Sequence, residues 1–316
     1  MNPWHLIVSF GLDLAFGDPG WLPHPVRLIG RAVTVLEKML RRWGVQRIGE
    51  RGAGMMLTGA VVLSSYGITW LMIFLAGKIQ PGMQGVLIVY FSYTVLAARS
   101  LGDEALGVFD RLRQSDLVSA RRRLSRIVGR ETDQLPVSGV VRATVETVAE
   151  NSSDGIVAPL FYLALGGPPL AMAYKAINTL DSMVGYRTPR YRDFGWASAR
   201  LDDLANYLPA RMTGFLMVLG AGLLFGRARS AWRMMFRDGR KHDSPNAGIP
   251  EAAAAGALGI RLGGPSRYAG WVKEKPWLGQ AVREAEPGHI RQAIRLMWTV
   301  SVLMLILCSM MLVVWR

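Results

Sequence analysis

A cluster of carboxylate and amide side chains marks the middle of the chain. Glu146, Glu150 and Asp154 are spaced four residues apart, and Asn151 stands between the last two. On a helix this spacing puts three carboxylates on one face, where like charges repel one another. A cation relieves that repulsion, and carboxylates combined with substrate phosphates are the usual surroundings of Mg²⁺. The pattern therefore favours a magnesium site or a cationic partner over the plainer alternative, a solvated acidic helix end.

A second polar cluster follows a Gly-Pro break. Lys175, Asn178, Asp181 and Ser182 are three or four residues apart, so a helix would place all four on one side. Charged side chains beside an apolar segment are costly unless they line a pocket. We expect these four residues to share a cavity.

Arginines are concentrated in the turn-rich segment that comes next. Arg187, Arg190 and Arg192 fall within six residues, and an acidic pair, Asp202 and Asp203, follows them. Guanidinium forks suit phosphate or carboxylate ligands. For any single arginine of this loop, a solvated position on a basic membrane face is an equal alternative.

Two shorter motifs lie near the ends of the chain. His24 and Asp18 stand in a proline-fixed loop, and Asp243 comes shortly before a helix that starts at Asn246 or Pro250. The free N–H groups of a helix start bind anions, but an ordinary capped helix fits the same residues. A histidine beside an acid is a candidate for proton transfer, although lone histidines are more often structural.

Long apolar runs indicate that these polar clusters lie between membrane-embedded helices. Uncharged stretches at 57–77, 83–98 and 296–315 suit membrane-spanning helices, since roughly 20 apolar residues cross the hydrocarbon core. Runs at 155–173 and 212–226 are interrupted by Gly and Pro or are short, so we interpret both as re-entrant segments that do not cross.

The composition supports this class of fold. Hydrophobic residues make up 51% of the 316 residues, which excludes a disordered chain, and the single cysteine, Cys308, excludes a disulfide framework. The net charge of +14 lies largely in loops beside the apolar runs, where it orients a membrane protein with its polar loops in the cytoplasm. We therefore expect an all-α polytopic integral membrane protein, one domain over 1–316, with about three to five transmembrane or re-entrant segments, polar helices facing the cytoplasm and no nucleic-acid partner.

Four ordered motifs resemble one known family over essentially the whole chain. The strings at 150–155 and 175–186, with Asp18-Pro19 and His24-Pro25-Val26 before them and 243–248 after them, are similar to the adenosylcobinamide-phosphate synthase family (CbiB, also called CobD) of cobalamin biosynthesis. The resemblance implies a multi-pass enzyme of the cell (inner) membrane that joins adenosylcobyric acid, a corrinoid, to 1-amino-2-propanol or its phosphate through an amide. ATP and Mg²⁺ are the cofactors it implies, and other late-pathway membrane enzymes are further partners.

The role assignments are hypotheses laid on the matched positions. Glu150, Asp154 and Asp181 are assigned to Mg²⁺-nucleotide, and Asn151, Asn178 and Asn246 to orientation of the acyl group. Lys175, Arg187 and Arg192 are assigned to phosphates, with Ser182 beside them. Asp243 or His24 is assigned to the proton of the amine.

Two other functions fit parts of the pattern. A transporter for an anionic substrate also uses broken helices and carboxylates within the membrane, but it is favoured by inverted repeats, and none is visible. A non-catalytic membrane sensor on the same scaffold is favoured by loss of the paired acid and amide residues, and all of them are present.

Overall fold

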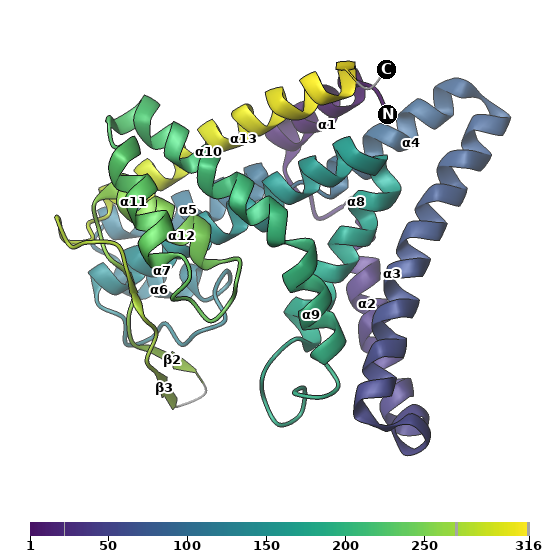
Figure 1. Ribbon diagram of the computed structural model, residues 1–316, viewed down its shortest axis with the longest axis horizontal. Helices are drawn as coiled ribbons and strands as arrows, with labels where there is room; N and C mark the ends of the chain where they lie inside the picture. Colours follow the sequence, from purple (N-terminus) through teal and green to yellow (C-terminus); the bar gives the residue numbers. More distant parts are fainter. Residues whose placement is uncertain (22, 269–270, 315–316) are drawn as a thin grey trace. The chain divides into compact units, whose positions relative to one another are not determined.

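The computed structural model describes residues 1–21, 23–268 and 271–314 of the chain, and in this part the fold is almost entirely helical (Figure 1). Fifteen helical elements follow one another: α1 (Pro3–Phe16), α2 (Pro25–Met39), η1 (Leu40–Gly44), α3 (Val45–Ile79), α4 (Pro81–Thr94), α5 (Ala98–Arg113), α6 (Leu117–Leu124), α7 (Val137–Ser152), η2 (Ser153–Val157), α8 (Ala158–Val184), α9 (Trp196–Ala205), α10 (Tyr207–Phe225), α11 (Ala228–Asp238), α12 (Gly248–Leu258) and α13 (Gly288–Val314). Four short strands interrupt them before α13. These are β1 (Leu262–Gly263), β2 (Ser266–Tyr268), β3 (Trp271–Lys273) and β4 (Trp277–Leu278), and they form two antiparallel pairs, β1 with β4 and β2 with β3.

Five helical stretches of the described residues are long and apolar enough to cross a membrane. They are Pro25–Ile79, Pro81–Arg113, Val137–Val184, Tyr207–Phe225 and Gly288–Val314. The expectation of an all-α polytopic membrane protein is confirmed.

The predicted spans match these helices with changes at their ends. The run at 57–77 lies inside α3, whereas the run at 83–98 is cut where α4 ends at Thr94 and α5 begins at Ala98. The run at 296–315 lies in α13, and its last residue is outside the described residues.

The two runs that we interpreted as re-entrant are also helical. Gly166 and Gly167, the latter with φ of 69°, break α8 next to Pro168 and Pro169, at the place where the sequence predicts a break. The run at 212–226 belongs to α10, which begins earlier, at Tyr207. With 19 residues α10 is long enough to cross a membrane, so its non-crossing placement stays a prediction.

The chain folds into two compact units, each made of separate stretches of sequence. Unit 1 comprises 1–97, 158–206 and 305–316, and unit 2 comprises 98–157 and 207–304. Unit 1 contains three separate stretches of sequence and unit 2 contains two, so neither unit is a contiguous piece of the chain.

In unit 1, α8 packs on both α3 and α9. Tyr174 is buried with Ile177, and its ring stacks on that of Tyr162 at 4.9 Å between centroids. The two phenol groups donate hydrogen bonds into the end of α9, Tyr162 to the carbonyl of Ala205 and Tyr174 to Oδ1 of Asn206, both at 2.8 Å. These contacts fix the acidic end of α9 against α8. Cys308 is also buried in this unit, with its Sγ 3.5 Å from the carbonyl of Leu160.

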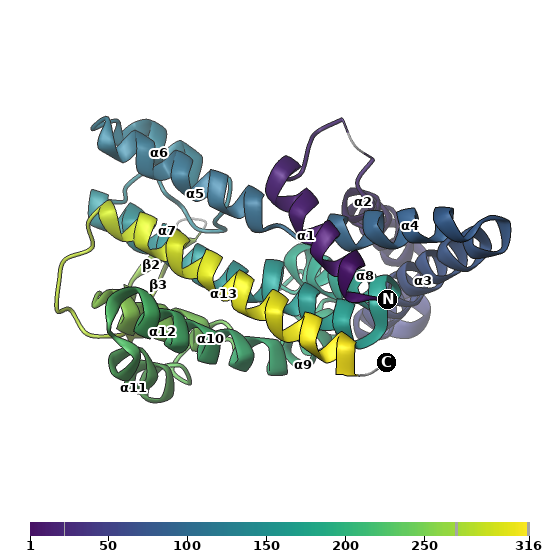
Figure 2. The same cartoon turned by 90° about the horizontal axis from the view of Figure 1, so that it is seen from above.

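Unit 2 is organised around α12, which packs against α10, α11 and α7 (Figure 2). Seven of the eleven residues of α12 are alanine or glycine, residues that favour or permit the close approach of helices. Gly256 makes this visible, because an added Cβ would lie 2.6 Å from the carbonyl oxygen of Ser230 at the start of α11. The only charged side chain of this buried helix is Glu251.

Candidate functional site

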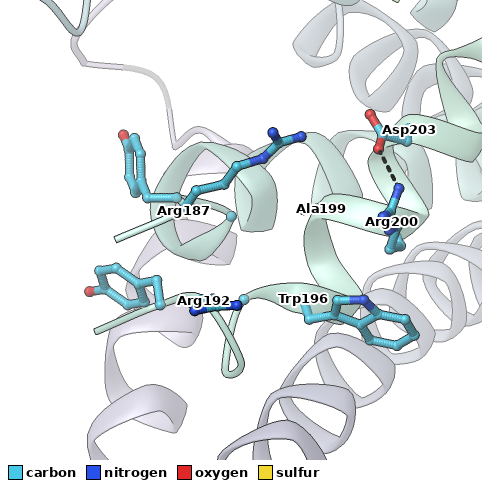
Figure 3. Close-up of a pocket in the computed structure, with 10 residues that line it drawn as sticks. Arg187, Arg192, Trp196, Ala199, Arg200 and Asp203 are labelled. Carbon is cyan, nitrogen blue, oxygen red and sulfur yellow. Dashed lines mark ion pairs between the residues drawn. The ribbon is translucent and has the colours of Figure 1, made fainter. Parts of the chain in front are cut away.

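A cavity of about 290 Å³ opens in unit 1 between the loop 185–195 and α9 (Figure 3). Arginines from both elements surround it, Arg187 and Arg192 from the loop and Arg200 from α9. Arg200 pairs with Asp203 at 3.6 Å, one helical turn further along. The remaining lining residues are Gly185, Tyr186, Tyr191, Gly195, Trp196 and Ala199.

Close backbone contacts fix the loop that carries two of these arginines. A Cβ on Gly195 would lie 1.8 Å from the carbonyl oxygen of Val184, so only glycine allows this approach to the end of α8. The neighbouring Phe194 is buried, and its carbonyl oxygen would lie 1.8 Å from a Cβ on Gly54 of α3. Arg41 covers the ring of Phe194 at 4.2 Å from its centroid. The loop is therefore held on both sides rather than free in solvent.

The acidic end of this region lies where α8 meets α9. Burial raises the pKa of Asp202 to about 7, and the nearby Asp181 carboxylate adds to the rise, whereas the side-chain amides of Asn206 and Asn178 oppose it. The Oδ1 atom of Asp202 is buried and has no hydrogen-bond partner within 3.5 Å among the described residues. Asp203 stands next to it and faces Arg200 and Arg187.

The four residues expected to share a cavity beside the Gly-Pro break are only partly brought together. Asn178 and Asp181 face Asp202. Ser182 is exposed, and its hydroxyl donates to the carbonyl of Asn178 one turn earlier at 2.8 Å. Lys175 is half-buried in the same helix.

Unit 2 holds a second polar cluster, built on α7. The carboxylate of Glu146 is buried and accepts a hydrogen bond from the backbone N–H of Gly263 at 2.7 Å, while Arg130 pairs with its other oxygen. Glu146 thereby ties β1 to α7. Both oxygens of the Glu146 carboxylate are occupied by these contacts, so the residue holds β1 in place and does not offer a binding site to a ligand.

Glu251 of α12 lies beside this tie. Burial raises the pKa of Glu251 well above the ordinary value, and the nearby carboxylates of Glu146 and Glu150 raise it further. The positive charges of Lys275 and Arg130 lower it by less. The 150–155 motif thus meets the helix that follows the 243–248 motif inside unit 2.

His242 approaches the same carboxylate. Its Nε2 is 4.0 Å from Oε1 of Glu251, and its Nδ1 accepts the backbone N–H of Ser244 at 3.0 Å. Burial lowers the pKa of His242, and the nearby Lys275 lowers it further. A neutral imidazole therefore faces Glu251 at neutral pH.

The remaining predicted residues of unit 2 have structural partners. Asn151 donates to the carbonyl of Thr147 at 3.0 Å, and Asn246, itself buried, accepts from Arg211 at 2.9 Å. Asp243 pairs with Lys273 of β3. Asp154 falls in the π-helical turn η2, which changes the periodicity that the sequence spacing assumes.

His24 lies in unit 1 at the start of α2, and its Nε2 is 3.1 Å from Oδ1 of Asp18. The histidine and acid of that motif therefore do meet. Within the described ranges of the chain, no three His, Cys, Asp or Glu side chains lie close enough together to hold a metal ion by themselves. A magnesium ion bound here would need ligands from its substrate, as magnesium sites commonly have.

Several polar residues of these clusters were not singled out as site residues from the sequence. Arg200, His242, Glu251 and Lys275 belong to this group; His242 and Glu251 flank the 243–248 motif, whereas Arg200 and Lys275 belong to none of the four motifs. For Glu251 a further signal was available, because a charged residue beside the alanine run of a buried helix is unusual.

These features define an all-α membrane protein with two polar clusters. The chain belongs to the CobD/CbiB family, because the family model described as "CobD/Cbib protein" matches residues 6–297. The family is one of cobalamin biosynthesis proteins by the names of its members. The chain is 51% identical over 300 residues to "Cobalamin biosynthesis protein CobD" of Geobacter metallireducens, covering 95% of this chain and 93% of the relative.

Other relatives are nearly as similar. "Cobalamin biosynthesis protein CobD" of Pelobacter propionicus is 48% identical over 97% of this chain and 94% of its own length. "Cobalamin biosynthesis protein CbiB" of Salmonella typhimurium is 48% identical over 95% of this chain and 94% of its own length. No solved structure matches the chain.

Proposed function

We propose that the protein is an adenosylcobinamide-phosphate synthase, an ATP-dependent ligase that joins the free carboxyl group of adenosylcobyric acid to 1-amino-2-propanol or its O-phosphate. The observation that carries the proposal is the membership in the CobD/CbiB family over nearly the whole chain. Relatives of about this length named for cobalamin biosynthesis support it. We place the protein in the cell membrane with its polar loops in the cytoplasm, where ATP and other late-pathway membrane enzymes meet it.

The donor groups of both units suit magnesium and nucleotide phosphates. Asp181 and Asp202 offer carboxylate oxygens beside the arginines of the loop 185–195, and the buried Oδ1 of Asp202 has no hydrogen-bond partner among the residues that the structure describes. Glu150 and Asp154 offer further carboxylates in unit 2. When bound, ATP with Mg²⁺ would supply the phosphoryl group that makes the carboxyl oxygen of the corrinoid a leaving group.

The side chains of this protein would bind and orient the reactants. We assign Asp181, Glu150 and Asp154 to Mg²⁺, and Lys175 with the loop arginines to phosphate charge. Asn178 is the amide best placed beside the acidic end of α9.

The amine must lose a proton as the amide forms, and a nearby base accelerates such a step by about 10²–10⁴-fold. His24, hydrogen-bonded to Asp18, and Asp243, paired with Lys273, are the two candidates. His24 has the geometry of a histidine oriented by an acid.

Purified protein supplied with adenosylcobyric acid, the amino alcohol or its phosphate, and Mg·ATP should form the corresponding cobinamide, detected by chromatography and mass spectrometry. Asp181→Asn should lower the rate strongly, whereas Asp193→Asn, on an exposed residue of the neighbouring loop, should not. Folded protein that yields no product with either amino alcohol would refute the ligase. Corrinoid uptake into vesicles without product would indicate a transporter, and binding without either would indicate a sensor.

A further inference from the structure

The residues that line the cavity between the loop 185–195 and α9 include more arginines than carboxylates. Three guanidinium groups, those of Arg187, Arg192 and Arg200, line it against the single carboxylate of Asp203. Arg192 makes no side-chain hydrogen bond or ion pair with any residue that the structure describes. Like charges gathered around one cavity are unfavourable unless an anion joins them.

The loop is also more rigid than a solvated basic loop needs to be. The backbone N–H groups of Arg192 and Gly195 donate to carbonyls within the loop at 2.8 and 2.7 Å. A guanidinium group of Arg41 donates to the carbonyl of Arg190 at 2.9 Å, and Arg190 in turn reaches Glu37 at 3.4 Å. A fixed loop presents its arginines in one arrangement, which lowers the cost of ordering them around a ligand.

Asp203 interacts with two of the three arginines that line the cavity. It lies 3.6 Å from Arg200 and also faces Arg187. The ion pair is exposed on the arginine side, where 66% of the Arg200 side chain is accessible. Such an exposed pair is weak, so an anion with more oxygens competes with it easily.

We propose that this cavity binds the phosphoryl group of a substrate through Arg187, Arg192 and Arg200, and that the phosphoryl oxygens take over the contacts that Asp203 makes with Arg200. Three guanidinium forks match the several oxygens of a phosphate better than the two of a carboxylate. The volume of about 290 Å³ admits a phosphate with a few attached atoms or the terminal phosphates of a nucleotide, and it is too small for a corrin ring. The inference rests on the proposed function only in its choice of phosphorylated substrates.

Binding can be tested without catalysis on the full-length protein in detergent, by calorimetry with inorganic phosphate, aminopropanol phosphate or a non-hydrolysable ATP analogue with Mg²⁺. At least one of these probes should bind to Arg192→Gln and to Arg200→Gln at least about tenfold more weakly than to the unchanged protein. Each variant removes a charge-assisted hydrogen bond. Arg47→Gln is the matched control, since Arg47 is an exposed arginine of the same unit outside the cavity, and it should bind as the unchanged protein does.

Asp203→Asn has the opposite expected sign. Removing the competing carboxylate should tighten the binding of inorganic phosphate about fivefold. This factor corresponds to the Coulomb energy between two unit charges about 4 Å apart in water. Thermal unfolding of each variant checks that the fold is retained. Arg200→Lys, which keeps the charge but not the fork, should lie between Arg200→Gln and the unchanged protein.

The probe whose affinity falls in the arginine variants identifies the source of the phosphoryl group. The inference is overturned if none of them distinguishes Arg192→Gln and Arg200→Gln from Arg47→Gln. Arginine-dependent binding without product formation would support the phosphoryl-binding cavity and refute the ligase activity. Normal product formation by both arginine variants, with unchanged KM for ATP and for aminopropanol phosphate, would remove the inference and leave the ligase.

Discussion

Replacing Glu146 by glutamine isolates the ion pair that ties β1 to α7. Only 5% of the Glu146 side chain and 11% of the Arg130 side chain are exposed, so the pair is screened from water. The glutamine oxygen still accepts the N–H of Gly263, so the variant loses the charge and keeps that hydrogen bond. Removing one partner of a buried pair costs about 3–5 kcal/mol. The retained hydrogen bond, and the relief of repulsion with Glu251, point to about 3 kcal/mol.

Thermal unfolding and hydrogen exchange would measure this loss. A loss of about 3 kcal/mol should lower Tm by roughly 6–12 °C in a unit of this size. The amides of 262–268 and 271–278 should exchange faster than those of α10, because β1 is the segment released. Glu104→Gln is the matched control, since Glu104 makes a half-exposed pair with Arg123 at 3.9 Å that is worth at most about 1 kcal/mol.

A Glu146→Gln variant no less stable than Glu104→Gln would refute a stabilising role of the buried ion pair. A uniform rise of exchange throughout unit 2 would also count against the local tie. Adding Arg130→Met to Glu146→Gln should recover part of the stability, because it removes the buried charge that the first substitution leaves alone.

Three further outcomes follow from contacts in both units. Gly195→Ala should lower stability by at least about 1–3 kcal/mol and weaken phosphate binding in the same variant, because its Cβ would lie 1.8 Å from the Val184 carbonyl; unchanged unfolding and binding would contradict this. Burial alone would raise the pKa of Asp238, but hydrogen bonds from Arg237, Lys241 and the N–H of Gly279 outweigh it and lower the pKa to about 2. The stability it contributes should therefore be present above about pH 4, the value for an unfolded aspartate, and be lost as the pH falls through about 2, and Asp238→Asn should flatten this part of the acid-unfolding curve. His24→Gln should reduce product formation by about 10²–10⁴-fold with little change in Tm if His24 accepts the amine proton, and a loss of Tm that accounts for the lost activity would exclude that role.

The helices were predictable because their signals are local. An uncharged stretch such as 57–77 specifies a long apolar helix by length alone, and the glycine-proline run predicts the break in α8. Helix ends were less predictable. The polar start of α10 at Tyr207 and the stop of α4 at Thr94 depend on packing, which composition does not report.

The polar clusters were predictable in part. Asn178 and Asp181 share one helix, so their spacing shows that they point the same way, but the sequence gives no reason why Asp202 should meet them. The contact of Glu146 with Gly263 joins residues 117 positions apart and depends on the fold of all the segments between them. The face shared by Glu146, Glu150 and Asp154 assumed a regular α-helix, and the π-helical turn at Asp154 changes that periodicity.

The burial of Cys308 makes the chain a convenient host for site-directed probes. It is the only cysteine of the sequence, and only 2% of it is exposed. A thiol so enclosed reacts slowly with polar maleimides, so new cysteines can be introduced without first removing the native one. Exposed positions such as Ser182 would then report, one at a time, from which side of the membrane a reagent reaches them.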